Sequence, residues 1–147
     1  MYKLTVVKTP CNLPSVKINS SLAGFTCAQN IYKEENLESD IYEYGIAIYL
    51  NRALETIGYK VISYGSDQAT LMDIRCILQP AIGLLANAIM IVHNHPSNRI
   101  VPSEMDNKLT KELHSATKIL KLDLVDHLIV ASNFEAYYSY KDEGIVL

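Results

Sequence analysis

With 147 residues, 49% of them apolar and 20% charged, the chain has the size and composition of one globular domain and not of a disordered or fibrous protein. Its 13 Lys and Arg against 16 Asp and Glu give a net charge of −3, which argues against a dedicated nucleic-acid-binding domain. We expect a single domain over residues 1–147, in which residues 1–16 form a peripheral strand and loop.

The cysteines and the longest apolar run indicate the compartment. Cys11, Cys27 and Cys76 form no C-x-x-C pair, so free thiols in a reducing environment are favoured over a disulfide framework. Residues 1–15 contain no apolar segment long enough for a signal peptide. The run over residues 77–92 is interrupted by polar residues and Pro80, and it is shorter than the roughly 20 residues that span a bilayer. These features predict a soluble, cytoplasmic protein without membrane contact.

The periodicity of the apolar residues and the helix caps predict alternating strands and helices. In chain order we expect a strand over 2–8, a loop over 9–18, a helix to about residue 33 capped by Asn19, Ser20 or Ser21, a strand hairpin over 44–50 and 56–64, a helix over 70–86, a central strand over 88–92, a helix over 104–121, and strands over 124–131 and 136–140. Interleaved strands and helices predict an α/β fold, in which helices flank a mixed β-sheet.

The most informative stretch, His93-Asn94-His95, follows the predicted central strand. Residues two apart in an extended segment point to the same side, so both imidazoles project beyond the carboxyl end of this strand. Open α/β sheets bind their ligands at this edge, and two imidazoles form a natural pair of Zn²⁺ ligands. From the residues alone, two partly buried structural histidines remain the alternative.

Ser103 and Asp106 also have two interpretations. Ser-x-x-Asp ahead of an amphipathic helix is typical of a capping box, with Ser103 as N-cap. The same residues complete the pattern H-x-H-x₇-S-x₂-D, in which two imidazoles and one carboxylate leave a fourth coordination position for water. That ligand set is typical of catalytic and not of structural zinc sites.

The motif from His93 to Ser97, followed by Pro102-Ser103-x-x-Asp106, resembles the signature of the JAMM (MPN+) metalloproteases, in the version found in the RadC family. The resemblance extends over about residues 17–147. Additional matching segments are Leu50-Asn51-Arg52, Asp73-x-Arg75, Asp126-His127-Leu128-Ile129-Val130 and Tyr137-Tyr138-Ser139-Tyr140-x-x-Glu143-Gly144.

This resemblance implies a cytidine-deaminase-like α/β/α fold, the JAB/MPN fold, with Zn²⁺ bound by His93, His95 and Asp106. It implies Glu43, which lies just ahead of the strand ending in Leu50-Asn51-Arg52, as the catalytic glutamate, and Ser103 as a hydrogen-bond donor to the oxyanion. The implied activity is hydrolysis of a peptide or isopeptide bond by a zinc-activated water. Without the resemblance, Glu43 is one acid within a surface cluster.

The sequence departs from the family pattern at two positions. Asn98 stands where the family usually has Gly, and because Asn tolerates a positive φ, we expect a mild change in the metal loop. Gly45 replaces a large apolar residue, which is expected to loosen the packing that aims Glu43. Longer relatives carry an N-terminal region resembling helix-hairpin-helix modules, which we expect this chain to lack.

Two other functions remain open: a DNA repair or recombination accessory protein of the RadC family, and a metal-binding interaction module without turnover. The expected partner is a protein or peptide substrate, not nucleic acid for this domain alone, and homodimerisation through an exposed edge strand stays open. We expect His127 to be a hydrogen-bonded structural histidine and Cys76 not to act as a nucleophile. Asp73 and Arg75, two apart in the predicted helix, are expected not to contact each other.

Overall fold

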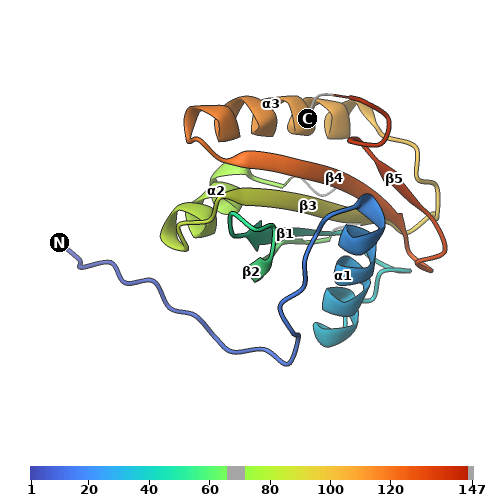
Figure 1. Cartoon of the computed structure of the whole chain (residues 1–147). Coiled ribbons are helices and arrows are strands. Elements are labelled where there is room, and N and C mark those ends of the chain that lie inside the picture. Colours follow the sequence, from blue (N-terminus) through green and yellow to red (C-terminus); the bar gives the residue numbers. More distant parts are fainter. Residues whose placement is uncertain (66–71, 146–147) are drawn as a thin grey trace.

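The computed structural model of the chain describes residues 1–65 and 72–145. The helices and strands in chain order are α1 (Ser21–Glu34), β1 (Tyr44–Leu50), β2 (Thr56–Tyr64), α2 (Ile74–Gly83), β3 (Ala88–His95), α3 (Glu104–Ile119), β4 (Asp123–Ala131) and β5 (Tyr137–Ser139) (Figure 1). The predicted α/β class with a mixed sheet is confirmed, and most element boundaries lie within three residues of the prediction.

The five strands form one sheet in the order β2-β1-β3-β4-β5. β1 pairs antiparallel with both β2 and β3, and β5 pairs antiparallel with β4. β3 and β4 are parallel, so the chain must cross from the end of one to the start of the other, and α3 makes this crossover. The carboxyl end of β3 therefore leads directly to the N-terminus of α3.

Helices cover both faces of the sheet. Alternate residues of a strand point to opposite sides, and in the buried strands both sets of residues are largely apolar, so both faces are packed against helices. Met90 and Val92 of β3 pack in the core beneath α1, whereas Ile89 and Ile91 pack in the core beneath α2 and α3. The helices lie on the two sides of the sheet in Figure 1. The three-layer α/β/α arrangement implied by the family resemblance is the observed one.

The prediction for Asp73 and Arg75 is wrong, because α2 begins later than expected. The helix was predicted from residue 70, and residues 70 and 71 lie outside the described part of the chain. Asp73 is the N-cap, with an extended backbone at ψ 120°, so helical spacing does not apply to it. Its carboxylate accepts a hydrogen bond from the Arg75 backbone N–H and forms an ion pair with the Arg75 guanidinium at 2.7 Å.

The predicted strand over residues 2–8 is also wrong. These residues belong to no strand, and the N-terminal segment extends away from the sheet in Figure 1. The side chains of Tyr2, Leu4 and Val7 are exposed. Alternation of apolar and polar residues alone does not make a strand, because the backbone hydrogen bonds of a strand require a neighbouring strand. Residues 5–11 instead border a cavity of about 750 Å³ against β2 and the end of α2, which contains none of the predicted site residues.

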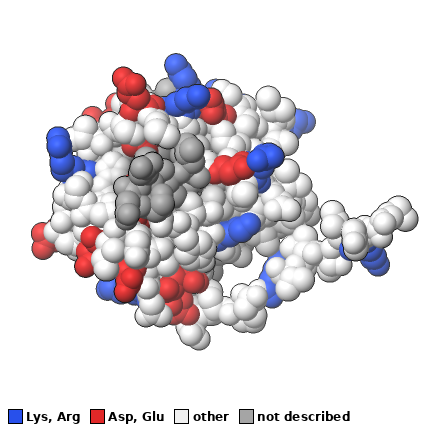
Figure 2. Space-filling view, turned by 180° about the vertical axis from the view of Figure 1, so that it is seen from behind, with Lys and Arg blue, Asp and Glu red and all other residues white. Residues whose placement is uncertain are grey.

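The surface and the helices give two further observations. Among the helices within residues 1–65 and 72–145, none is long and apolar enough to cross a membrane. On the face shown in Figure 2, Lys and Arg side chains stand singly or in small groups among Asp and Glu.

Candidate metal centre

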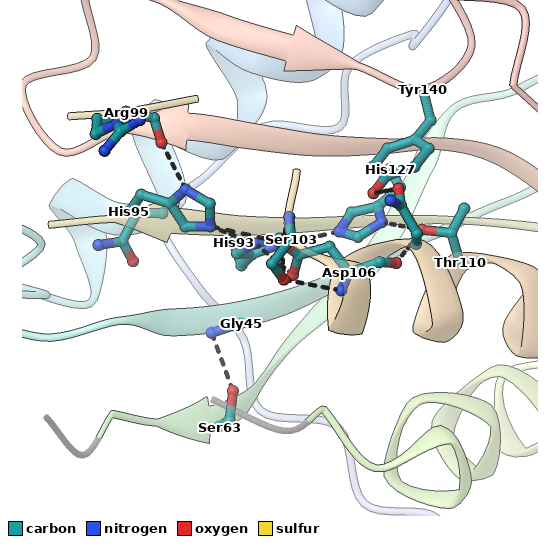
Figure 3. Close-up of polar contacts among 12 residues, drawn as sticks. Gly45, Ser63, His93, His95, Arg99, Ser103, Asp106, Thr110, His127 and Tyr140 are labelled. Atoms are coloured by element: carbon teal, nitrogen blue, oxygen red, sulfur yellow. Dashed lines mark hydrogen bonds and ion pairs between the residues drawn. The ribbon is translucent and has the colours of Figure 1, made fainter. Parts of the chain in front are cut away.

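The predicted site residues come together at the carboxyl end of β3. His93 and His95 project from this strand on the side covered by α3, where Asp106 lies in the first turn (Figure 3). Glu43 immediately precedes β1, and because β1 runs antiparallel to β3 with Gly45 opposite His93, Glu43 reaches the same edge. One ligand atom from each of Glu43, His93 and His95 lies within 4.8 Å of the others.

The spacing of the nitrogen and oxygen atoms suits a single ion. Two ligand atoms each 2.0–2.1 Å from a tetrahedral Zn²⁺ lie about 3.3 Å apart. The Nε2 atoms of His93 and His95 are 3.1 Å apart, and Asp106 Oδ1 lies 3.1 Å from His93 Nε2. Asp106 Oδ2 lies 3.8 Å from His95 Nε2. The two distances from His93 Nε2 match this spacing, whereas the distance between His95 and Asp106 is longer and involves the other carboxylate oxygen. The three residues whose ligand atoms all lie within 4.8 Å of one another are Glu43, His93 and His95.

Asp106 combines the two roles that its sequence pattern left open. The capping box is present, because the Ser103 hydroxyl accepts from the Asp106 N–H at 3.1 Å and Asp106 Oδ2 accepts from the Ser103 backbone N–H at 2.7 Å. The Ser103 hydroxyl also donates to Asp106 Oδ2 at 2.7 Å. Burial acts to raise the pKa of Asp106, but the hydrogen bond and charge of His93 and the bonds from Ser103 hold that pKa well below its usual range. The carboxylate is ionised, with Oδ2 bound to the cap and Oδ1 facing His93.

The loop after β3 orients His95. The His95 Nδ1 atom lies 2.6 Å from the carbonyl oxygen of Arg99, which can only accept, so Nδ1 carries the hydrogen and the Nε2 lone pair points to the site (Figure 3). Asn98 makes this turn possible with φ 61°, a conformation that Asn tolerates. Its side-chain oxygen accepts hydrogen bonds from Ser132 and Asn133. The positive φ that Asn was expected to tolerate is observed at Asn98, while the effect of this departure on the metal loop stays a prediction.

His93 is contacted by a second buried histidine. Its Nδ1 atom lies 2.9 Å from Nε2 of His127 on β4, and Nδ1 of His127 lies 2.6 Å from the Thr110 hydroxyl on α3 (Figure 3). Burial lowers the pKa of His127 well below its usual value, and the nearby charge of His93 acts in the same direction. His127 is thus a neutral, fully hydrogen-bonded histidine, as predicted, and not a further metal ligand.

Asn94 is a residue of the site that the sequence interpretation missed. It points to the opposite face from its two histidine neighbours and is fully buried. Its side-chain amide makes four hydrogen bonds, accepting from Tyr44 N–H at 2.8 Å and Tyr32 O–H at 3.1 Å and donating to the carbonyls of Ser39 at 2.8 Å and Tyr42 at 2.9 Å. Asn94 therefore fixes to β3 the segment that carries Glu43. A polar residue between the two histidines on a buried strand was the available signal.

Two glycines allow close packing around Glu43. A Cβ atom at position 45 would overlap the Met72 side chain and lie 2.7 Å from Ser63 Oγ, so these two side chains occupy the space that a larger residue would fill. The expectation that Gly45 loosens the packing is therefore wrong. Gly65 lies directly against the backbone of Glu43, where a Cβ would overlap the Glu43 carbonyl oxygen.

Gly65→Ala is expected to destabilise the protein by about 1–3 kcal/mol, because the added methyl group must displace the Glu43 backbone. Thermal unfolding of the purified variant measures this change. Gly58→Ala on β2 is the matched control, since its Cβ would approach only Leu84 Cδ1, at an ordinary 3.4 Å. Equal stability losses in the two variants would contradict the assigned contact.

The family model of the RadC-like JAB domain matches residues 22–145. The chain belongs to the RadC family. Among its curated RadC-family relatives, a UPF0758 protein of Flavobacterium johnsoniae is 34% identical over 129 residues, which cover 88% of this chain and 53% of the relative. A UPF0758 protein of Porphyromonas gingivalis is 38% identical over 99 residues, 67% of this chain and 43% of the relative.

A UPF0758 protein of Thermotoga maritima is 33% identical over 129 residues, which cover 87% of this chain and 54% of the relative. This RadC-family chain thus spans about half the length of the curated relatives that it matches. The matched region includes all the predicted site residues, from Glu43 to Asp106. The chain is a RadC-like JAB domain with a histidine and glutamate cluster that can hold a metal ion.

Proposed function

We propose that this chain is a zinc-dependent hydrolase of the JAMM type, which cleaves a peptide or isopeptide bond. The observation that carries the proposal is the convergence of Glu43, His93 and His95 within 4.8 Å, with Asp106 Oδ1 3.1 Å from His93 Nε2. Two imidazoles and a carboxylate suit Zn²⁺, and an additional carboxylate beside them suits a general base. A metal-binding module without turnover would not need that additional carboxylate.

Each residue has a distinct role in the proposed reaction. His93, His95 and Asp106 would hold Zn²⁺, which when bound supplies a Lewis acid and lowers the pKa of water from 15.7 toward about 7. Glu43 accepts the proton of the attacking water and passes it to the leaving nitrogen as the C–N bond breaks. The ionised Asp106 supplies the negative charge that balances the cation.

Ser103 would donate a hydrogen bond to the oxyanion that forms at the attacked carbonyl, an interaction typically worth about 3 kcal/mol. Its single hydroxyl hydrogen is directed to Asp106 Oδ2 in the structure. Donation to an oxyanion therefore requires that this hydrogen turn away from Asp106, while the Asp106 N–H bond to the hydroxyl oxygen can remain.

The proposal is tested by elemental analysis of protein purified without chelator, together with hydrolysis of internally quenched peptides and lysine-linked isopeptides. We expect about one Zn²⁺ per chain, and we expect its removal by a chelator to abolish cleavage. Asp106→Asn should lose the metal, because the ligand set loses its carboxylate charge. Asp123→Asn, an exposed change at the start of β4, is the matched control and should keep it.

Failure of the wild-type protein to bind zinc even when it is supplied would contradict the metal site. A protein that binds zinc but cleaves neither class of substrate would contradict the hydrolase assignment and support a binding module instead.

A further inference from the structure

Three side chains from three elements form a continuous hydrogen-bonded path behind His93. The path runs from His93 Nδ1 on β3 to His127 Nε2 on β4 at 2.9 Å, and from His127 Nδ1 to Thr110 Oγ1 on α3 at 2.6 Å. The Thr110 hydroxyl also lies 2.7 Å from the Asp106 carbonyl oxygen, one turn earlier in the same helix. All three side chains are buried, at 2% exposure or less, so water cannot replace a missing bond.

The number of hydrogens decides the direction of every bond in this path. The Asp106 carbonyl oxygen can only accept, so the single Thr110 hydroxyl hydrogen is directed to it. Nδ1 of His127 must then donate to Thr110 Oγ1. A neutral His127 has no second hydrogen, so its Nε2 accepts, and His93 Nδ1 must donate to it. This is the one assignment that forms all three bonds with a neutral, buried His127.

This assignment determines which ring nitrogen of His93 is available to bind a metal ion. With Nδ1 of His93 committed to His127, Nε2 is the ring atom left to face His95 and Asp106, and a metal ion bound there takes the place of any hydrogen on it. The His127 ring is itself held in place, because Tyr140 stacks on it with ring centroids 4.8 Å apart and planes 3° from parallel (Figure 3). The Tyr140 hydroxyl is anchored in turn to Asn107 on α3 at 2.8 Å.

We propose that His127 is a positioning residue, which, with Thr110, holds His93 in the Nδ1–H tautomer and thereby keeps Nε2 available as a metal ligand. Metal-ligating histidines usually donate their second N–H to a carboxylate, a carbonyl or water. Here a second imidazole takes that place, and its own orientation is set by a helix carbonyl through Thr110. This inference rests on the proposed zinc site, but it also makes a claim about the metal-free protein.

The metal-free protein provides the first test. Long-range ¹H–¹⁵N correlation spectra at about pH 8, where an ordinary imidazole is neutral, report which ring nitrogen carries the hydrogen. We expect Nδ1 of both His93 and His127 to carry a hydrogen. His93 found without a hydrogen on Nδ1 would overturn the inference, whether or not the protein binds zinc.

The second test measures zinc affinity by competition with a chelator. His127→Phe keeps a flat ring against Tyr140 but removes the acceptor for His93, and we expect a 10- to 100-fold loss of affinity. His127→Gln restores an acceptor oxygen and should recover part of this loss. Wild-type zinc affinity in His127→Phe would overturn the inference.

A pair of threonine variants keeps the test valid if His127→Phe fails to fold. Thr110→Val removes the acceptor for His127 Nδ1–H, so His93 should become a mixture of tautomers and zinc affinity should fall about 10-fold. Thr117→Val is the matched control, because Thr117 is equally buried on α3 but bonds only to the His114 carbonyl among the described contacts. Equal effects of the two substitutions on the His93 tautomer would contradict the proposed role.

Wild-type protein without zinc affinity but with His93 in the Nδ1–H form would contradict the proposed function and leave the tautomer assignment standing. If the protein binds zinc but His93 of the metal-free protein has no hydrogen on Nδ1, the tautomer assignment is contradicted and the proposed zinc site stands. The two proposals are therefore tested separately.

Discussion

Glu43→Gln is expected to lower the rate of hydrolysis by about 10²- to 10⁴-fold while the protein keeps its zinc. Glutamine has nearly the same shape as glutamate but cannot accept the proton of the attacking water. The metal should remain, because His93, His95 and Asp106 are unchanged and lie within 3.1–3.8 Å of one another. The measurement is the cleavage rate of the quenched substrates, together with zinc content by elemental analysis.

Glu38→Gln is the matched control for this prediction. Glu38 lies in the same acidic segment but is exposed, and its removal should leave both the rate and the zinc content unchanged. If Glu43→Gln kept the wild-type rate, Glu43 would not be the base. If it lost its zinc together with activity, Glu43 would instead act as a metal ligand.

Asn94→Asp is expected to destabilise the fold by about 3–5 kcal/mol. A carboxylate keeps the acceptor for the Tyr44 N–H but loses both donors, so a buried negative charge would face the carbonyl oxygens of Ser39 and Tyr42. Since this amide holds the segment that carries Glu43, hydrolysis should fall as well. Urea denaturation at neutral pH measures the free energy of unfolding.

Asn30→Asp is the same chemical change at an exposed position of α1, and its effect is expected to stay within about 0.5 kcal/mol. Denaturation midpoints that are equal for the two variants would show that the buried amide does not hold this segment.

The elements defined by strong local patterns were predicted closely. β1 and β2 have the predicted boundaries, and Ser20 and Ser103 cap α1 and α3 as their sequences indicated. These features depend on neighbouring residues alone. The strand expected over residues 2–8 has the right alternation but no pairing partner, and α2 begins only after Asp73, so pattern alone was insufficient there.

The family motif identified the candidate site residues, and the structure brings Glu43, His93, His95 and Asp106 together. Gly45 shows the limit of this interpretation, because its space is filled by Met72 and Ser63 from other segments. A single sequence does not tell which distant side chain fills a gap. The roles of Glu43 and Ser103 stay predictions that the proposed variants test.

The sequence by itself determined the pattern of candidate ligands, because the spacing of His93 and His95 on a strand and that of Ser103 and Asp106 at a helix start are local properties. Only the tertiary structure decided which groups orient those ligands. His127 lies 34 positions after His93, and Asn94 lies 50 positions after Tyr44, so these contacts depend on strand order and on the α3 crossover. The sheet topology, and not the local spacing, places a second histidine behind the first.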